Sequence, residues 1–181
     1  MGQQSNKSEL IVAIEASGAE VVATLRALPP EAFARLDPAG EWTGREILAH
    51  IASIEWTYPR LLDIGRQAQA SGATSGGQPA GSVRRTEPGE AAGVTSAVAQ
   101  GGIDGYNERQ VQKRADASVA ELIDEFRRNR EATIAAIEQA DESLLQTPIR
   151  SAGGVTGPLA GVFQAVAVGH VLGHTRDIVG Q

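Results

Sequence analysis

Apolar residues recur at intervals of three and four along several long stretches of this chain, which restricts it to packed helices. The first stretch runs from Ser8 to Leu28, and its apolar positions include Ile11, Ile14, Val21, Val22 and Leu25. This spacing places them on one face of an α-helix. No stretch shows the period-two alternation that is typical of a half-buried strand. The pattern therefore predicts an all-α fold.

A second helix is expected to begin after Trp42, because Thr43 and Glu46 have the spacing of a capping box. Its apolar face consists of Ile47, His50, Ile51 and Ile54 and continues toward Tyr58, Leu61 and Leu62. Pro59 lies within this run and should kink or end the helix, since proline lacks an N–H and collides with the preceding turn.

Two further helices are expected in the second half of the chain. Ser118 and Glu121 repeat the capping-box spacing before a third helix that should end near Ala140. After a glycine turn at 153–154, Pro158 suits the first position of a fourth helix. The expected inward face of this helix is Leu159, Val162, Phe163, Val166, His170, His174 and Ile178. These patterns predict a four-helix bundle that forms a single domain over residues 1–181.

A long glycine-rich segment at 65–105 separates the second and third helices. It holds ten of the 21 glycines and shows no sustained period. A loop of this length within a compact domain is usually functional or mobile, so we interpret it as a lid or an oligomer contact. Plain disorder is the alternative. A short helix over Asp104 to Arg114 should follow.

Charge and composition narrow the classes of function. The net charge of −6 over 181 residues argues against nucleic acid as a partner. Charged residues interrupt every apolar stretch and no secretory signal is visible, so we expect no membrane contact and a cytoplasmic location. The absence of cysteine excludes disulfides, thiol nucleophiles of the chain itself and cysteine-based zinc sites. Histidine, aspartate and glutamate remain for metal binding or acid–base chemistry.

The three histidines of the chain form a candidate metal site. His170 and His174 are four residues apart, so a helix presents both imidazoles on the same side. His50, from another helix, can supply a third ligand and leave a fourth position for water or substrate. The alternative is a bundle with three core histidines and no metal, because a lone histidine on an apolar face is usually a satisfied core residue.

Arg130 falls in the middle of the apolar face of the third helix. An inward guanidinium beside a metal is suited to clamp a substrate carboxylate through two hydrogen bonds. The alternative is an internal ion pair, for which Asp177 is the nearest candidate because it follows His174 by three residues. Asp177 is equally suited to accept a hydrogen bond from a ligand histidine and orient it.

Four other aromatic residues are assigned to packing. Trp42 should anchor the start of the second helix, and Trp56 should pack on a neighbouring helix or a second copy of the chain. Tyr58 and Tyr106 are expected in the core or an interface rather than at the metal site.

Two short segments resemble one family. Residues 42–50, with the sequence WTGREILAH, and residues 170–178, with HVLGHTRDI, are similar to the DinB-like superfamily, which includes thiol-dependent maleylpyruvate isomerases and bacillithiol transferases. Residues 106–109 and 121–137 resemble the isomerase-like branch. The resemblance implies a four-helix bundle in which His50, His170 and His174 bind a divalent metal, zinc or nickel.

The same resemblance implies a reaction. The open metal position would receive a low-molecular-weight thiol, such as mycothiol or bacillithiol, that adds to or is transferred onto a small electrophile. Because the chain has no cysteine, the sulfur nucleophile must come from outside. We therefore expect a thiol-dependent transferase or isomerase, and a homodimer, since family members often pair through helical faces. The alternative is a non-catalytic metal-binding or stress-response module.

Overall fold

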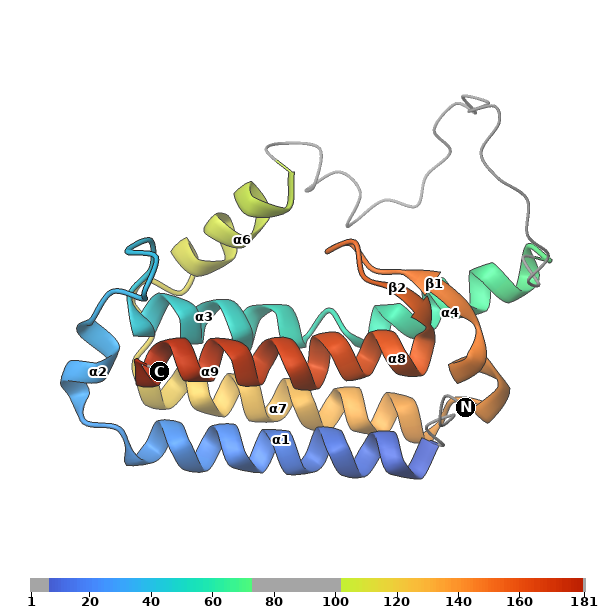
Figure 1. Cartoon of the computed structure of the whole chain (residues 1–181), viewed down its shortest axis with the longest axis horizontal. Coiled ribbons are helices and arrows are strands. Elements are labelled where there is room, and N and C mark those ends of the chain that lie inside the picture. The colour runs from blue at the N-terminus through green and yellow to red at the C-terminus, as the bar shows by residue number, and fades with distance from the viewer. Residues whose placement is uncertain (1–6, 73–101, 181) are drawn as a thin grey trace.

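Four helical columns lie side by side in the computed structural model, which describes residues 7–72 and 102–180 (Figure 1). The first column is α1 (Lys7–Ala27), and the third is α7 (Val119–Glu138). The second column consists of α3 (Gly44–Glu55) followed by α4 (Pro59–Ala70). The fourth is α8 (Leu159–Phe163), the π-helical turn η2 (Gln164–His170) and α9 (Val171–Val179). The predicted all-α bundle is confirmed.

Short elements connect the columns: α2 (Pro30–Ala34), α6 (Gly102–Gln112), the 3₁₀ turn η1 (Glu142–Gln146), β1 (Pro148–Arg150) and β2 (Thr156–Pro158). The strands β1 and β2 pair antiparallel, with Ile149 opposite Gly157. This small hairpin was not predicted, because strands of three residues are too short to show a period of two. In the part of the chain that the structure describes, no helix is long and apolar enough to cross a membrane.

Both predicted capping boxes form. At the start of α3 the backbone N–H of Thr43 donates to Oε2 of Glu46 at 2.8 Å, and the hydroxyl of Thr43 accepts from the backbone N–H of Glu46. Ser118 and Glu121 make the same pair of bonds at the start of α7. As expected, Pro59 marks a break, since α3 ends at Glu55 and α4 begins at the proline.

Several predicted boundaries shift. Helix α4 continues to Ala70, so the segment from 65 to 70 is helix rather than loop. Gly65 of this helix packs closely against η1 and α8, since a Cβ there would lie 3.1 Å from side-chain atoms of both Leu144 and Leu159, a close approach that composition does not reveal. Helix α6 begins at Gly102. The fourth column begins at Leu159, one residue after Pro158, which ends β2. The predicted lid or oligomer contact falls largely on residues 73–101, outside the described residues.

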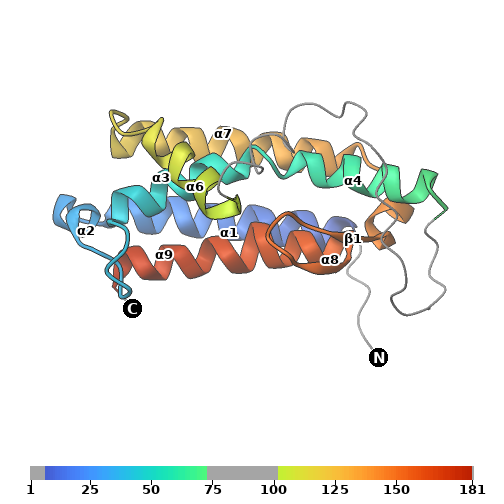
Figure 2. The ribbon, with the colours of Figure 1, turned by 90° about the horizontal axis from the view of Figure 1, so that it is seen from above.

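The packing of α3 between two other helices places His50 at the candidate site. Its largely apolar sequence is buried against α7 on one side and α9 on the other, as Figure 2 shows from above. Phe126 of α7 and Val171 of α9 belong to the same core cluster as Ile47 and Ile51 of α3. A helix that packs against two neighbours brings its own side chains next to residues far away in the sequence. His50 is placed by this packing.

Candidate metal centre

Three imidazoles from two helical columns converge at the junction of η2 and α9. The ring centroid of His50 lies 5.6 Å from that of His170 and 5.1 Å from that of His174. The two rings of the fourth column are 4.4 Å apart. Three ring nitrogens, one from each histidine, lie within 4.8 Å of one another. The structure therefore brings the three predicted residues together in a cluster that can hold a metal ion.

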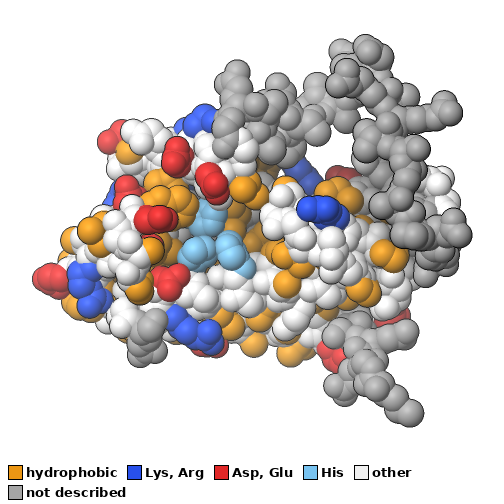
Figure 3. Space-filling model, turned by 45° about the horizontal axis from the view of Figure 1, so that its top comes forward, with side chains coloured by type: hydrophobic (Ala, Val, Ile, Leu, Met, Phe, Trp, Pro, Cys, Tyr) orange, Lys and Arg blue, Asp and Glu red, His pale blue; other side chains and the backbone are white. Residues whose placement is uncertain are grey.

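The three histidines differ in exposure. His50 is buried with 4% of its surface exposed, His174 is half-buried and His170 is exposed. The prediction that all three lie on inward faces is thus wrong for His170. Figure 3 shows the histidine side chains, in pale blue, as one patch at the molecular surface with acidic side chains beside it. Within the cluster, His50 lies in the core and His170 is exposed to solvent.

His170 is the last residue of the π-helical turn η2. Buried positions in the fourth column step by four, from Phe163 through Ala167 and Val171 to Thr175. In a regular α-helix residues four apart drift by about 40° per step, and the π-helical turn, with more residues per turn, reduces this drift over Gln164–His170. The wider turn keeps Ala167 and Val171 inward. His170 is left at the edge of the apolar face.

The nitrogen positions fit a metal ion. Nε2 of His170 and Nε2 of His174 are 3.1 Å apart. Two nitrogens that each lie about 2.1 Å from a tetrahedral zinc are separated by roughly 3.4 Å, close to this distance. Nδ1 of His50 is buried and has no hydrogen-bond partner among the described residues. A satisfied core histidine would pair both ring nitrogens, so this unpartnered atom favours a ligand role for the cluster.

Burial keeps the imidazoles of His50 and His170 neutral. Burial, with smaller contributions from the neighbouring His174 and His170, lowers the pKa of His50 to about 3. Desolvation, followed by the charge of His174, lowers the pKa of His170 to about 4. Both rings are therefore unprotonated at neutral pH. Metal ligation requires this form of histidine.

Asp177 contacts the cluster from the next turn of α9. Its Oδ2 lies 3.2 Å from Nδ1 of His174. Of the two roles expected for Asp177, the structure shows the hydrogen bond to a histidine and not the ion pair with Arg130.

Arg130 is buried in the bundle with 3% of its surface exposed, and its ion-pair partner is Glu55, at 2.9 Å. Its Nη1 donates to the carbonyl of Ile14 and the hydroxyl of Ser17, and its Nη2 also donates to the carbonyl of Ala167. Both terminal nitrogens are therefore occupied by protein groups. This arrangement contradicts the expected clamp on a substrate carboxylate.

Glu55 is the buried partner that sequence reasoning missed. Burial raises the pKa of its carboxyl to about 7, against the opposing effect of Arg130. Its Oε1 is buried without a hydrogen-bond partner among the described residues. One signal was available: Glu55 follows Ile47 and Ile51 at steps of four on the inward face of α3.

The aromatic residues follow the predictions in part. Trp42 lies at the start of α3, as expected, and its ring contacts His50 edge-on at 5.1 Å between centroids. Tyr58 is buried and donates to the carbonyl of Val166 at 2.8 Å. Trp56 is 41% exposed and its ring lies against the guanidinium of Arg60, and the expected contact with a second copy of the chain stays a prediction.

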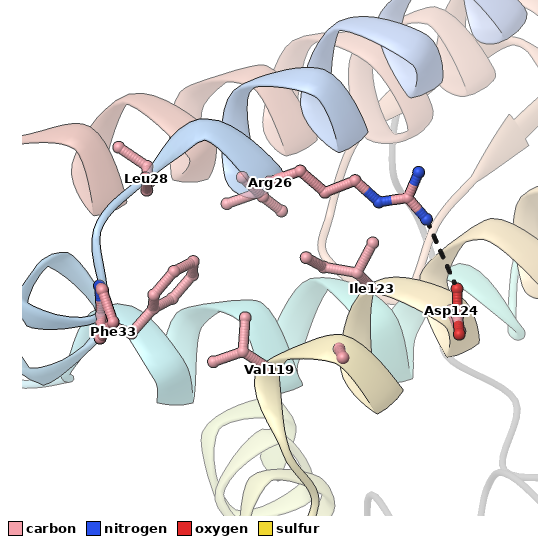
Figure 4. Close-up of a pocket in the computed structure, with 9 residues that line it drawn as sticks. Arg26, Leu28, Phe33, Val119, Ile123 and Asp124 are labelled. Carbon is pink, nitrogen blue, oxygen red and sulfur yellow. Dashed lines mark ion pairs between the residues drawn. The ribbon is translucent and has the colours of Figure 1, made fainter.

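A separate hollow of about 410 Å³ lies between α1, α2 and the start of α7 (Figure 4). Its walls include Phe33, Val119 and Ile123, and the ion pair of Arg26 with Asp124 at 3.7 Å lies at its edge. None of the three histidines lines it. This hollow is therefore not part of the histidine site.

Comparison with known proteins identifies the family. The sequence matches the DinB superfamily over residues 13–178, a range that includes all three histidines. The chain belongs to this superfamily, as the resemblance of the two histidine segments indicated. Comparisons with curated proteins and with solved structures gave no match.

Proposed function

We propose that this protein binds one divalent metal ion, zinc or nickel, through His50, His170 and His174. The supporting observation is the convergence of three imidazoles, one of them buried with an unpartnered nitrogen. Three protein ligands with a fourth position open to solvent are the arrangement of catalytic rather than structural zinc sites. The exposure of His170 gives a small molecule access to that position.

The reaction that we propose is the transfer of a low-molecular-weight thiol, or an isomerisation that depends on one, with a small electrophile as substrate. A bound divalent metal would lower the pKa of a thiol and hold it as the thiolate, the nucleophilic form. His50 and His170 supply neutral imidazoles, and Asp177 orients His174. It has no cysteine that would compete for the metal.

Metal analysis tests the binding step. Untagged protein, dialysed against chelator and reloaded with Zn²⁺ or Ni²⁺, should retain one ion per chain by elemental analysis. His50→Ala, His170→Ala and His174→Ala should each lose it, whereas Arg176→Ala, an exposed residue of α9, should not. Equal metal content in the wild type and the histidine variants would contradict the proposal.

Turnover with a panel of thiols and electrophiles tests the reaction. Metal-loaded wild type should consume thiol, and the histidine variants should not. A loaded protein that turns over no combination would instead favour the non-catalytic metal-binding or stress-response module. A filled fourth coordination position would favour it as well.

We also propose a cytoplasmic location, where a thiol cofactor would be kept reduced. We further propose a homodimer and no nucleic acid partner. Light scattering coupled to size-exclusion chromatography measures the mass in solution, and a monomer would contradict the dimer.

A further inference from the structure

The turn that carries His170 is held by side chains from other parts of the bundle. The backbone of the π-helical turn η2 departs from the regular i+4 bonding pattern, and side chains from other helices donate hydrogen bonds to two of its carbonyls. The hydroxyl of Tyr58 donates to the carbonyl of Val166 at 2.8 Å. Nη2 of Arg130 donates to the next carbonyl, that of Ala167, at 2.7 Å. These two carbonyls lie within one turn before His170.

The Arg130 side chain is itself fixed in place. Its Nη1 bonds to the carbonyl of Ile14 and the hydroxyl of Ser17, both at 2.9 Å and both in α1. Its Nη2 pairs with Glu55 at the end of α3. The guanidinium carbon lies 4.8 Å from the ring centroid of Phe126, on its own helix. Arg130 therefore ties α1, α3 and α7 to the turn that ends at His170.

The hydroxyl of Tyr58 remains protonated and donates its hydrogen bond to the carbonyl of Val166. Burial raises the pKa of its phenol well above the ordinary value, and the negative charge of Glu55 adds to this effect. The phenol keeps its proton under all ordinary conditions and donates to Val166. Tyr58 thus adds a second, uncharged link between the junction of α3 with α4 and the π-helical turn.

We propose that Arg130 and Tyr58 are positioning residues that hold the π-helical turn so that His170 faces His174 and His50. This inference rests on the proposed metal function, and it assigns the two residues an indirect role, since neither contacts the metal. Without their bonds, the turn is free to relax toward regular α-helix. The ring of His170 would then rotate away from its two partners.

A purely structural role makes a different prediction. If Arg130 and Tyr58 only stabilised the core, their replacement would lower thermal stability and leave the metal affinity of the folded protein unchanged. Tyr58→Phe is the sharpest variant, because it removes one hydroxyl and preserves the ring. Arg130→Lys keeps the charge beside Glu55 and gives up the forked geometry. Tyr106→Phe, in α6 outside this network, is the matched control.

The experiment measures Zn²⁺ affinity and the spectrum of bound Co²⁺ on full-length variants whose folding is verified by circular dichroism. Tyr58→Phe should weaken Zn²⁺ binding about tenfold, in the range seen for groups that orient metal ligands. Arg130→Lys should weaken it at least as much and alter the Co²⁺ spectrum. Tyr106→Phe should match the wild type. Unchanged affinity and spectrum in folded Tyr58→Phe would overturn the inference.

A metal-free measurement separates this inference from the proposed function. The nitrogen resonances of His170 in the metal-free protein should differ between the wild type and Tyr58→Phe, and not between the wild type and Tyr106→Phe. If the wild type bound no metal while Tyr58→Phe moved these resonances, the metal function would be wrong and the positioning role correct. If the wild type bound metal and Tyr58→Phe moved neither affinity nor resonances, the positioning role would be wrong.

Discussion

Oδ2 of Asp177 lies 3.2 Å from Nδ1 of His174, one turn further along the same helix. A proton on Nδ1 that is donated to this carboxylate leaves Nε2 with a free lone pair. That nitrogen lies 3.1 Å from Nε2 of His170. The contact thus selects the tautomer of His174 that is able to bind a metal together with His170.

Replacing this carboxylate should weaken metal binding. Asp177→Asn retains the shape of the side chain and removes its charge, so it should lower Zn²⁺ affinity about 10–100-fold. Thermal stability should change little, since 40% of the Asp177 side chain is exposed. Competition with a chromophoric chelator measures the affinity. Asp124→Asn, a comparable change at the exposed pair with Arg26, is the control and should bind like the wild type.

Metal binding should be visible in the fluorescence of one of the two tryptophans. The ring of Trp42 contacts the ring of His50, whereas Trp56 stacks with Arg60. Coordination places positive charge beside Trp42, so Zn²⁺ titration should change the emission of Trp56→Phe, in which Trp42 remains. The emission of Trp42→Phe should stay constant. An equal response of both variants would show that the signal does not come from the His50 contact.

Gly18 provides the space for the Arg130 side chain. A Cβ at this position would lie 2.6 Å from Cδ of Arg130, whose guanidinium is held by protein partners. Gly18→Ala should therefore destabilise the protein by about 1–3 kcal/mol, although alanine favours helix. Gly173→Ala, in a helix with open space around it, should instead be stabilising by about 0.5–1 kcal/mol. Chemical denaturation measures both, and a stabilised Gly18→Ala would contradict the close contact.

The burial of Glu55 predicts a pH dependence of stability. Its pKa is about 7 in the folded protein and 4.5 in the unfolded chain. Between these values the folded state holds a proton that the unfolded state has lost, so the free energy of unfolding falls as pH rises. The slope for one group is at most about 1.4 kcal/mol per pH unit.

Glu55→Gln removes this titration while all other groups remain. The difference in the free energy of unfolding between wild type and Glu55→Gln should therefore shift in favour of the variant from pH 5 to pH 7. Urea denaturation at several pH values measures the difference. A constant difference over this range would show that Glu55 stays ionised beside Arg130 when folded.

Local patterns of the sequence predicted much of the fold. Some features follow from backbone chemistry within one turn of helix and are therefore predictable from the sequence. They are the capping boxes at Thr43 and Ser118 and the break at Pro59. The spacing of His170 and His174 is likewise local. The convergence of His50 with this pair was predictable because each lies on or beside the inward face of its helix.

Tertiary structure decided which polar groups meet. Arg130 pairs with Glu55, 75 residues away, rather than with Asp177. The partner depends on how far each helix is rotated about its axis, and helical periodicity defines an inward face without fixing what lies opposite. The π-helical turn and the exposure of His170 arise in the same way. The sequence thus determined the helices and the spacing of the histidines. Packing between helices determined the geometry of the site, because the partners of a buried charge such as Arg130 come from other helices of the core.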